Sequence, residues 1–254
     1  FETKFYNNIN ELFCNEYIDC VYVAANPKTN FKIFNLLKFK KIPMILEKPF
    51  CDNSTDGRKM IRLINKNQNK VFTNLPNIYA DTYEITKELI LKNFNKIEKI
   101  IIHEGASGPQ NDNIHPILDW GIHSLSYILC IFEEFEINKI KYKEIKKTKD
   151  NKFCVSKFDL KIKNKMHIKI LTGNFFKKKT RILKIILKDG KIFINDFINH
   201  KIWQNTNLIY QSKSTPLENL LDIFANCLND KSQNNGLNEI NKSLESIKII
   251  EKFI

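Results

Sequence analysis

Two groups of polar residues stand where apolar segments end, and both could handle a proton. Glu47 and Lys48 follow the apolar run at residues 42–46. A lysine at the end of a buried strand needs a partner or a wet cleft, and there it could donate hydrogen bonds to a substrate hydroxyl or to a cofactor ribose. The alternative is that Glu47 and Lys48 only mark the place where the strand emerges into water.

The second group is Asp119 and His123, which lie four residues apart in a stretch that we expect to be helical over 117–132. At that spacing both side chains share one face of a helix. A carboxylate beside an imidazole can raise the pKa of the imidazole and orient its ring, so that it exchanges a proton with an alcohol or carbonyl near neutral pH. A surface or capping pair is the alternative interpretation.

The elements that must position these residues alternate in the first third of the chain. Apolar runs at 19–25, 42–46 and 71–73 predict strands, and capped amphipathic stretches between them predict helices. Short links between such elements are typical of parallel β-α-β units. Ligands of parallel sheets bind at the carboxyl ends of the strands, where Asn26 and Lys48 stand.

After residue 77 the pattern changes. Alternating strands dominate residues 137–210, and Asp189-Gly190 predicts a hairpin turn because this dipeptide tolerates positive φ values. Helices return in the last forty residues. We therefore predict an α/β fold with a parallel sheet domain over 1–77, followed by an α+β domain over 78–254 with a large open, mainly antiparallel sheet.

Composition limits the class of protein. The 254 residues are 43% hydrophobic and 27% charged, as in globular proteins, and no apolar stretch is long enough to predict a membrane span. Six scattered cysteines without a C-x-x-C pair indicate reduced, structural thiols of a cytoplasmic protein. The histidines show no metal-ligand spacing with one another or with the cysteines, so we expect no bound metal.

The formal net charge of +13 suggests a nucleic-acid partner at first sight. Only three of the 41 basic residues are arginine, the residue most used to read bases, and the lysines alternate with apolar residues. The densest run, Lys177-Lys178-Lys179, falls at an expected turn. The lysines therefore indicate solvated faces, and we expect no nucleic-acid partner.

The order of these motifs resembles the Gfo/Idh/MocA family of NAD(P)-dependent oxidoreductases. The matching residues are the strand and turn at 19–27, the motif Glu47-Lys48-Pro49 and, further on, Asp119-Trp120-Gly121-Ile122-His123. The family joins an N-terminal Rossmann domain with an E-K-P motif to a C-terminal α/β domain with a D-x-x-x-H motif. The first domain is then an incomplete Rossmann-like sheet, because the G-x-G-x-x-G turn with which the family opens does not occur in this sequence.

The resemblance implies roles for individual residues. Lys48, Asp119 and His123 would be catalytic: Lys48 contacts the nicotinamide and the substrate, His123 is the general acid/base on the substrate hydroxyl, and Asp119 positions the substrate or the imidazole. The bond before Pro49 is often cis in relatives. The residues expected to bind the cofactor, NAD or NADP, are Ala25, Asn26, Pro27, Glu47 and Lys48.

The implied function is that of a cytoplasmic enzyme that moves a hydride between NAD(P) and a hydroxyl or keto carbon of a sugar or sugar-nucleotide-like substrate, as in surface-polysaccharide pathways. A homo-oligomer through the C-terminal sheet is expected. The missing glycine turn supports a second hypothesis, a non-catalytic sugar-binding or scaffolding remnant that has lost the nucleotide site. Nucleic-acid binding, the third hypothesis, depends on charge alone. Asn30 stands where many relatives have histidine, which leaves the substrate open.

Overall fold

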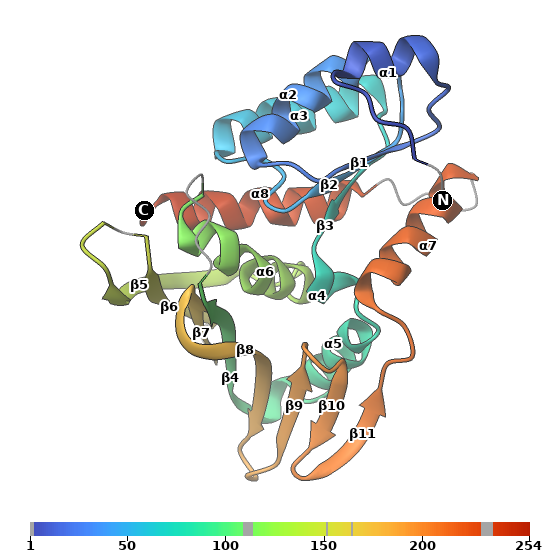
Figure 1. Ribbon diagram of the computed structural model, residues 1–254. Coiled ribbons are helices and arrows are strands. Elements are labelled where there is room, and N and C mark those ends of the chain that lie inside the picture. The colour runs from blue at the N-terminus through green and yellow to red at the C-terminus, as the bar shows by residue number, and fades with distance from the viewer. Residues whose placement is uncertain (1–2, 109–113, 151, 164, 230–235) are drawn as a thin grey trace.

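The computed structural model describes residues 3–108, 114–150, 152–163, 165–229 and 236–254. Two sheets lie on either side of two long central helices, α6 (Pro116–Ile131) and α8 (Leu237–Glu251). In Figure 1 the smaller sheet, sheet A, lies above these helices and the larger one, sheet B, lies below them. None of the described helices is long and apolar enough to cross a bilayer.

Sheet A is the parallel sheet that the sequence predicts. Its strands, in spatial order, are β1 (Val21–Val23), β2 (Met44–Glu47) and β3 (Val71–Asn74). The helices beside it are α1 (Ile9–Asn15), α2 (Pro27–Leu37) and α3 (Ser54–Asn67). Met44 and Leu46 enter the main hydrophobic core, whereas Ile45 packs with Phe72 and with Phe224 of α7 (Pro216–Leu228). Strands of sheet A are therefore apolar on both faces, as is usual for parallel sheets.

Sheet B has eight strands in the described part of the chain, in the order β11-β10-β9-β8-β4-β7-β6-β5. Its neighbours are antiparallel except for β4 and β7. The strands are β4 (Ile97–Ser107), β5 (Ile137–Lys147), β6 (Cys154–Ile162), β7 (Met166–Gly173), β8 (Phe175–Leu187), β9 (Ile192–Asp196), β10 (Lys201–Gln204) and β11 (Asn207–Gln211). The prediction of a parallel sheet followed by a larger, mainly antiparallel sheet is confirmed.

Two local predictions for sheet B have different outcomes. The hairpin at Asp189-Gly190 joins β8 to β9, and Gly190 has the positive φ (83°) that this turn requires. The expected turn at Lys177-Lys178-Lys179 is wrong, because these residues lie inside β8. Consecutive positive charges favour exposure to solvent. An exposed part of a strand provides this as well as a turn does, so the three lysines alone do not predict a turn.

The two sheets share one hydrophobic core through α8. This helix packs against α6 of the second part of the chain and against α3 and β3 of the first. Gly236 begins the helix with φ 74°, and a Cβ there would lie 2.2 Å from the carbonyl oxygen of Val71. At its other end, Glu251 Oε1 accepts a hydrogen bond of 2.6 Å from the backbone N–H of Ser54, at the start of α3. The domain boundary near residue 77 stays a prediction.

The remaining helices line the junction between the sheets. They are α4 (Pro76–Tyr79) and α5 (Thr82–Lys92), which lead from β3 into β4 through a short 3₁₀ turn at Phe94–Lys96. The predicted helix that carries Asp119 and His123 is α6, and nearly all of its side chains are buried because it lies between sheet B and α8. Asp119 and Trp120 are only half-buried, whereas the other residues of α6 are buried, which places Asp119 at the edge of the buried region.

We expect Ile247→Ala in α8 to lower the free energy of unfolding by about 2–5 kcal/mol, because it removes buried methyl groups and leaves a cavity. Ile247 is 0% exposed. Urea unfolding followed by circular dichroism measures the change. Ile254→Ala, at a residue that is 49% exposed, is the matched control and should cost less than about 0.5 kcal/mol. Equal losses in the two variants would contradict a core shared through α8.

Candidate functional site

The carboxyl ends of the three parallel strands carry a linked set of polar side chains. Glu47 Oε1, at the end of β2, accepts hydrogen bonds from the Tyr22 hydroxyl on β1 and from the Asn74 amide on β3, the latter at 2.9 Å. The Asn74 amide also donates to the Tyr22 oxygen at 3.0 Å. Burial and the bond to Glu47 raise the pKa of Tyr22 to about 12, so the phenol stays protonated and donates. Glu47 Oε2 is left without a hydrogen bond to the described residues.

The loop after β1 opens α2 and is fixed by a side-chain cap. Asn26 Oδ1 accepts the backbone N–H of Thr29 at 3.0 Å, and Pro27 occupies the first turn of the helix, where it forfeits no hydrogen bond. Ala25 is partly buried and Asn26 is exposed. Because β1 and β2 are parallel neighbours, this loop and Glu47 lie at the same edge of sheet A.

Asn30, one turn further along α2, joins this loop to the E-K-P motif. Its side chain is 0% exposed, and its amide donates to the carbonyl oxygens of Glu47 (2.9 Å) and Pro49 (3.4 Å). The peptide bond between Lys48 and Pro49 is cis, as the family resemblance implies. Asn30 therefore holds the backbone on both sides of Lys48, a structural role for a residue that departs from the family pattern.

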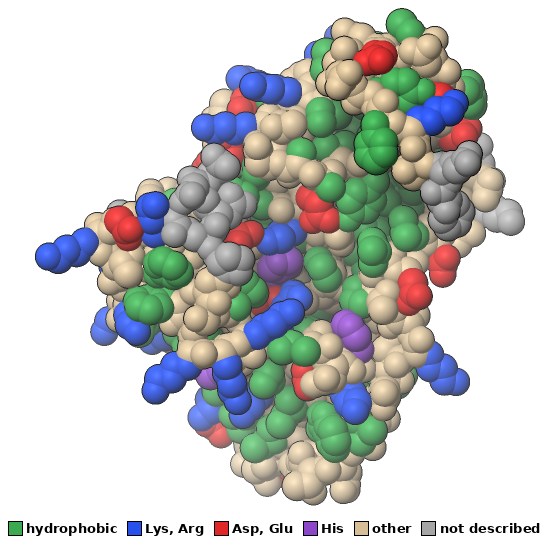
Figure 2. All heavy atoms as spheres, viewed as in Figure 1, with side chains coloured by type: hydrophobic (Ala, Val, Ile, Leu, Met, Phe, Trp, Pro, Cys, Tyr) green, Lys and Arg blue, Asp and Glu red, His purple; other side chains and the backbone are tan. Residues whose placement is uncertain are grey.

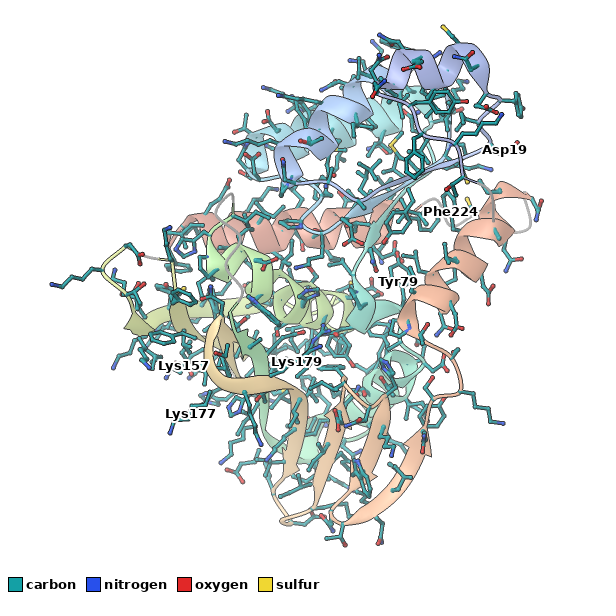
Figure 3. All side chains as sticks on the ribbon, in the orientation of Figure 1. Asp19, Tyr79, Lys157, Lys177, Lys179 and Phe224 are labelled. Atoms are coloured by element: carbon teal, nitrogen blue, oxygen red, sulfur yellow. The ribbon has the colours of Figure 1, made fainter. Side chains whose placement is uncertain are left out.

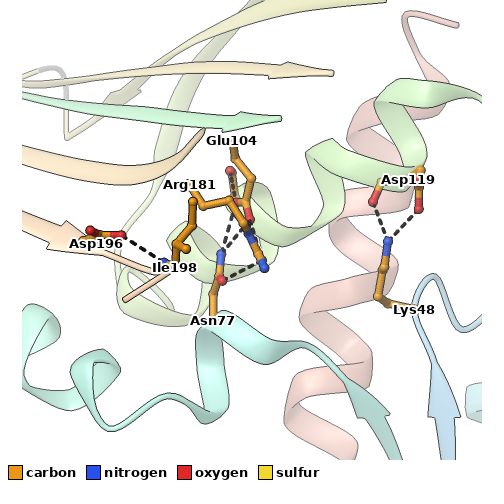
Figure 4. Close-up of polar contacts among 8 residues, drawn as sticks. Lys48, Asn77, Glu104, Asp119, Arg181, Asp196 and Ile198 are labelled. Atoms are coloured by element: carbon orange, nitrogen blue, oxygen red, sulfur yellow. Dashed lines mark hydrogen bonds and ion pairs between the residues drawn. The ribbon is translucent and has the colours of Figure 1, made fainter. Parts of the chain in front are cut away.

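Lys48 contacts Asp119 across the space between the two sheets. The ammonium Nζ lies 2.6 Å from Asp119 Oδ1 and donates a second bond of 3.0 Å to the Asp119 carbonyl oxygen (Figure 4). Both side chains are about four-fifths buried, at 21% and 24% exposure. The spacing in the sequence instead predicts that Asp119 pairs with His123. Lys48 takes the carboxylate because a full positive charge at the end of β2 is a stronger partner than an imidazole.

His123 is buried, at 6% exposure, and its Nδ1 atom has no hydrogen-bond partner among the described residues. Burial holds the pKa of His123 well below its usual range, and the positive charges of Lys48 and Arg181 lower it further. The expectation that a carboxylate raises this pKa is therefore wrong. His123 is therefore a neutral imidazole at physiological pH, the form that has a lone pair for a proton, and its low pKa makes it a weaker base than an exposed histidine.

A second buried network adjoins His123. Glu104 of β4 is 0% exposed and accepts hydrogen bonds from Ser124 Oγ (2.6 Å), Asn77 Nδ2 (3.1 Å) and Arg181 Nε (2.8 Å) (Figure 4). The Arg181 guanidinium also donates to Asn77 Oδ1 at 2.9 Å. These four residues come from β4, α4, α6 and β8, so one carboxylate ties together the elements around His123.

The sequence reasoning missed this network, although it left a signal. Glu104 is an acid at the end of the isoleucine-rich run 100–102, in a strand where a buried charge needs compensation. Arg181 is one of three arginines in a chain whose other basic residues are lysine. Arginine is the usual partner of a buried carboxylate because its planar fork makes several bonds at once.

Lys48, Asp119 and His123 are thus brought together, and Ala25, Asn26, Pro27 and Glu47 lie at the adjoining sheet edge. Figure 2 shows a hollow between the part built on sheet A and the part built on sheet B, with basic and histidine side chains gathered in it. Among the described residues no group of three or more histidine, cysteine or acidic side chains could hold a metal ion.

Residues 1–75 match the model of an oxidoreductase family with an NAD-binding Rossmann fold, named GFO_IDH_MocA. The predicted family resemblance is confirmed. The matched segment contains the loop at 25–27 and the residues Glu47 and Lys48, and the class that the match gives is an NAD-binding oxidoreductase. No curated protein sequence matches the chain.

Solved structures of dehydrogenases share the fold over nearly the whole chain. A dehydrogenase from Chromobacterium violaceum superposes with a TM-score of 0.80 at 13% identity, over 97% of this chain and 78% of that one. UDP-N-acetylglucosamine 3-dehydrogenase from Acidithiobacillus ferrooxidans gives 0.77 at 14% identity, over 98% and 83%. An inositol dehydrogenase homologue from Azotobacter vinelandii, complexed with NADH and myo-inositol, gives 0.74 at 13% identity, over 92% and 74%.

The residues of this chain fit one end of the dinucleotide that the family binds. Glu47 Oε2 is available to accept from a ribose hydroxyl, and Lys48 stands beside it at the carboxyl end of β2. Close approach of a backbone to pyrophosphate requires glycine, and the first glycine among these residues is Gly57, inside α3, so residues 1–56 do not form a glycine turn for the pyrophosphate. The described residues therefore fit the nicotinamide half.

We expect Glu104→Gln to lower the free energy of unfolding by about 3 kcal/mol, because Arg181 then stays buried without a counter-charge. Urea unfolding at neutral pH is the measurement. The matched control is Glu98→Gln on the same strand, where the side chain is 52% exposed and its ion pair with Lys99 should contribute under about 0.5 kcal/mol. If both variants lose the same free energy, the Glu104 network does not hold these elements together.

Proposed function

We propose that this protein is an NAD-dependent dehydrogenase that oxidises a hydroxyl group of a sugar-like substrate, or reduces the corresponding ketone. The single observation that carries the proposal is the placement of a lysine and a neutral histidine on facing elements, Lys48 at the end of β2 and His123 on α6. When bound, NAD supplies the hydride acceptor at its nicotinamide ring. The protein has to orient the substrate and move one proton.

His123 is the proton acceptor in this proposal. A hydroxyl that loses a hydride must also lose its proton, and a neutral imidazole accepts that proton without first releasing one. Burial and the positive charges of Lys48 and Arg181 hold the pKa of His123 well below its usual range, so the ring is neutral at physiological pH. In the reverse direction the protonated ring returns the proton to the carbonyl oxygen, and the same positive surroundings make it a strong acid.

Lys48 orients the reacting oxygen. An ammonium group has three N–H donors, and Lys48 uses two of them on Asp119. The third donor is free among the described residues to bind the substrate oxygen, where a positive charge stabilises the alkoxide character that develops as the proton leaves. Asp119 acts by fixing the ammonium in place, and Asn30 acts by fixing the backbone on both sides of Lys48.

A sugar-like substrate is supported by two neighbours whose names give a polyhydroxylated ring, UDP-N-acetylglucosamine in one and myo-inositol in the other. The second candidate function is a non-catalytic sugar-binding or scaffolding protein. Residues 1–56 contain no glycine, so a glycine turn for the pyrophosphate is not among them. Cofactor binding and turnover decide between the two functions.

We expect Lys48→Ala and His123→Ala each to lower the rate of NADH formation by about a hundredfold or more, since each removes a group that acts on the reacting oxygen. The assay uses excess NAD⁺ with UDP-N-acetylglucosamine or myo-inositol as the probe, and circular dichroism verifies the fold of each variant. Lys66→Ala is the control, an exposed lysine in the last turn of α3, at the opposite edge of sheet A. Unchanged rates in the Lys48 and His123 variants would remove the assigned roles.

NADH binding to the wild-type chain should engage the nicotinamide end. In a saturation-transfer NMR experiment we expect protons of the nicotinamide and its ribose to receive more saturation than those of the adenine, because Glu47 and Lys48 face that end alone. Lys48→Ala should reduce the nicotinamide signal, and Lys66→Ala should leave it unchanged. Equal saturation of both rings, or none at all, would contradict the proposed cofactor site.

A further inference from the structure

The Glu47 carboxylate is bound through one of its two oxygens. Oε1 accepts hydrogen bonds from the Tyr22 hydroxyl and from the Asn74 amide, whereas Oε2 makes none to the described residues. The Asn74 amide also donates to the Tyr22 oxygen, which closes a ring of three side chains. Each strand of sheet A contributes one member of this ring. A closed ring of hydrogen bonds leaves the carboxylate little freedom to turn.

The polar hydrogens of the ring all have acceptors within it. An amide nitrogen carries two hydrogens, and Asn74 Nδ2 gives one to Glu47 and the other to Tyr22. The Tyr22 hydroxyl has a single hydrogen, which goes to Glu47. The ring therefore has no donor left over, and what it offers to a ligand is acceptor oxygens, among them the charged Oε2 of Glu47. Such a site suits a ligand that brings hydroxyl groups.

The strand register explains why the ring needs a tyrosine. Tyr22 pairs with Ile45, two residues before Glu47, and Glu47 pairs with Asn74. Residues two apart on a strand share a face and are separated by about 6.5–7 Å. Asn74 lies directly opposite Glu47 and reaches it with a short side chain, whereas Tyr22 has to span the extra distance along the strand. Phenylalanine at this position would fill the same space without the hydroxyl that reaches Glu47.

The core of sheet A does not depend on this ring. On the same face, Ile45 and Phe72 are buried and pack with Phe224 of α7, which Figure 3 shows where that helix meets the sheet. Tyr22 lies on the outer strand β1 and is 41% exposed. Water competes for hydrogen bonds at so exposed a place, so the Tyr22 hydroxyl adds little to stability. Its main effect is on the orientation of Glu47.

We propose that Tyr22 is a positioning residue for the cofactor: its hydroxyl, together with Asn74, fixes Glu47 so that Oε2 accepts from a hydroxyl group of the nicotinamide ribose. This rests on the proposed function, which brings the nicotinamide end of NAD to Glu47 and Lys48. A carboxylate that is already fixed loses little entropy when the ribose binds, so the Tyr22 hydroxyl strengthens cofactor binding. Tyr22 takes no part in proton transfer, which belongs to His123.

Titration of the chain with NADH, followed by the fluorescence of the reduced nicotinamide, tests the proposal without turnover. We expect Tyr22→Phe to raise the Kd of NADH about tenfold, as for the loss of one hydrogen bond to a charged group. Tyr17→Phe is the matched control, because Tyr17 is 90% exposed and its hydroxyl makes no hydrogen bond to a described residue. It should leave the Kd unchanged, and circular dichroism verifies the fold of both variants.

A double-mutant cycle separates positioning through Glu47 from a purely structural role of the hydroxyl. In a Glu47→Ala background, Tyr22→Phe should cause no further rise in the Kd, because the group that Tyr22 positions is gone. A structural role would weaken NADH binding equally in both backgrounds, and that result overturns the proposal. If Glu47→Ala abolishes binding, saturation-transfer NMR of Tyr22→Phe decides: we expect the ribose protons to lose saturation relative to the nicotinamide ring protons, and a uniform loss overturns the proposal.

The outcomes also distinguish this inference from the dehydrogenase proposal. Absence of NADH binding to the wild-type chain overturns both. Equal Kd values for the wild type and Tyr22→Phe, with weaker binding by Lys48→Ala, overturn the positioning role alone. A fall in kcat of Tyr22→Phe at saturating NAD⁺, with KM unchanged, would assign the hydroxyl to the reaction itself and would likewise overturn the positioning role.

Discussion

A carboxylate with no solvent exposure at the centre of the larger sheet imposes the strongest constraint on this molecule. Glu104 can stay charged only if donors surround it, and these come from three separate elements: Asn77 of α4, Ser124 of α6 and Arg181 of β8. The hydrogen bond from Ser124 to Glu104 positions α6 against sheet B. The position of His123, which precedes Ser124, follows from it, and so does the rigidity of the Arg181 guanidinium.

The smaller sheet reaches the same place through one ion pair. Lys48 extends from the end of β2 to Asp119 in the first turn of α6, so the two halves of the site meet at a contact that is mostly shielded from water. In a part-buried setting such a bond is stronger than an exposed surface pair. Two charge-compensated pairs therefore hold the site. Lys48 of β2 pairs with Asp119 of α6, and Arg181 of β8 pairs with Glu104 of β4.

Local sequence rules predicted much of this arrangement and failed where partners are distant. Buried apolar runs and capping residues predicted the parallel sheet, and Lys48, Asp119 and His123 were singled out from their types and spacing. The rule of four-residue spacing paired Asp119 with His123, because nothing local reveals that Lys48 arrives from 71 residues away. Glu104 was missed for the same reason, since its three donors lie far along the chain. The run Lys177-Lys178-Lys179 was predicted as a turn and lies in β8, because the pairing of that strand with β4 is also non-local.

Helix α8 has a consequence for the order in which the protein can form. β3 and α3 bury apolar surface against this helix, yet 162 residues of chain (75–236) lie between the end of β3 and its start. On the ribosome, sheet A emerges early with that surface uncovered, and it must wait until synthesis has passed residue 251 before its core closes. The site between the sheets thus becomes complete only after α8 has been synthesised, and chaperones that shield exposed apolar surface would act on sheet A in the interval.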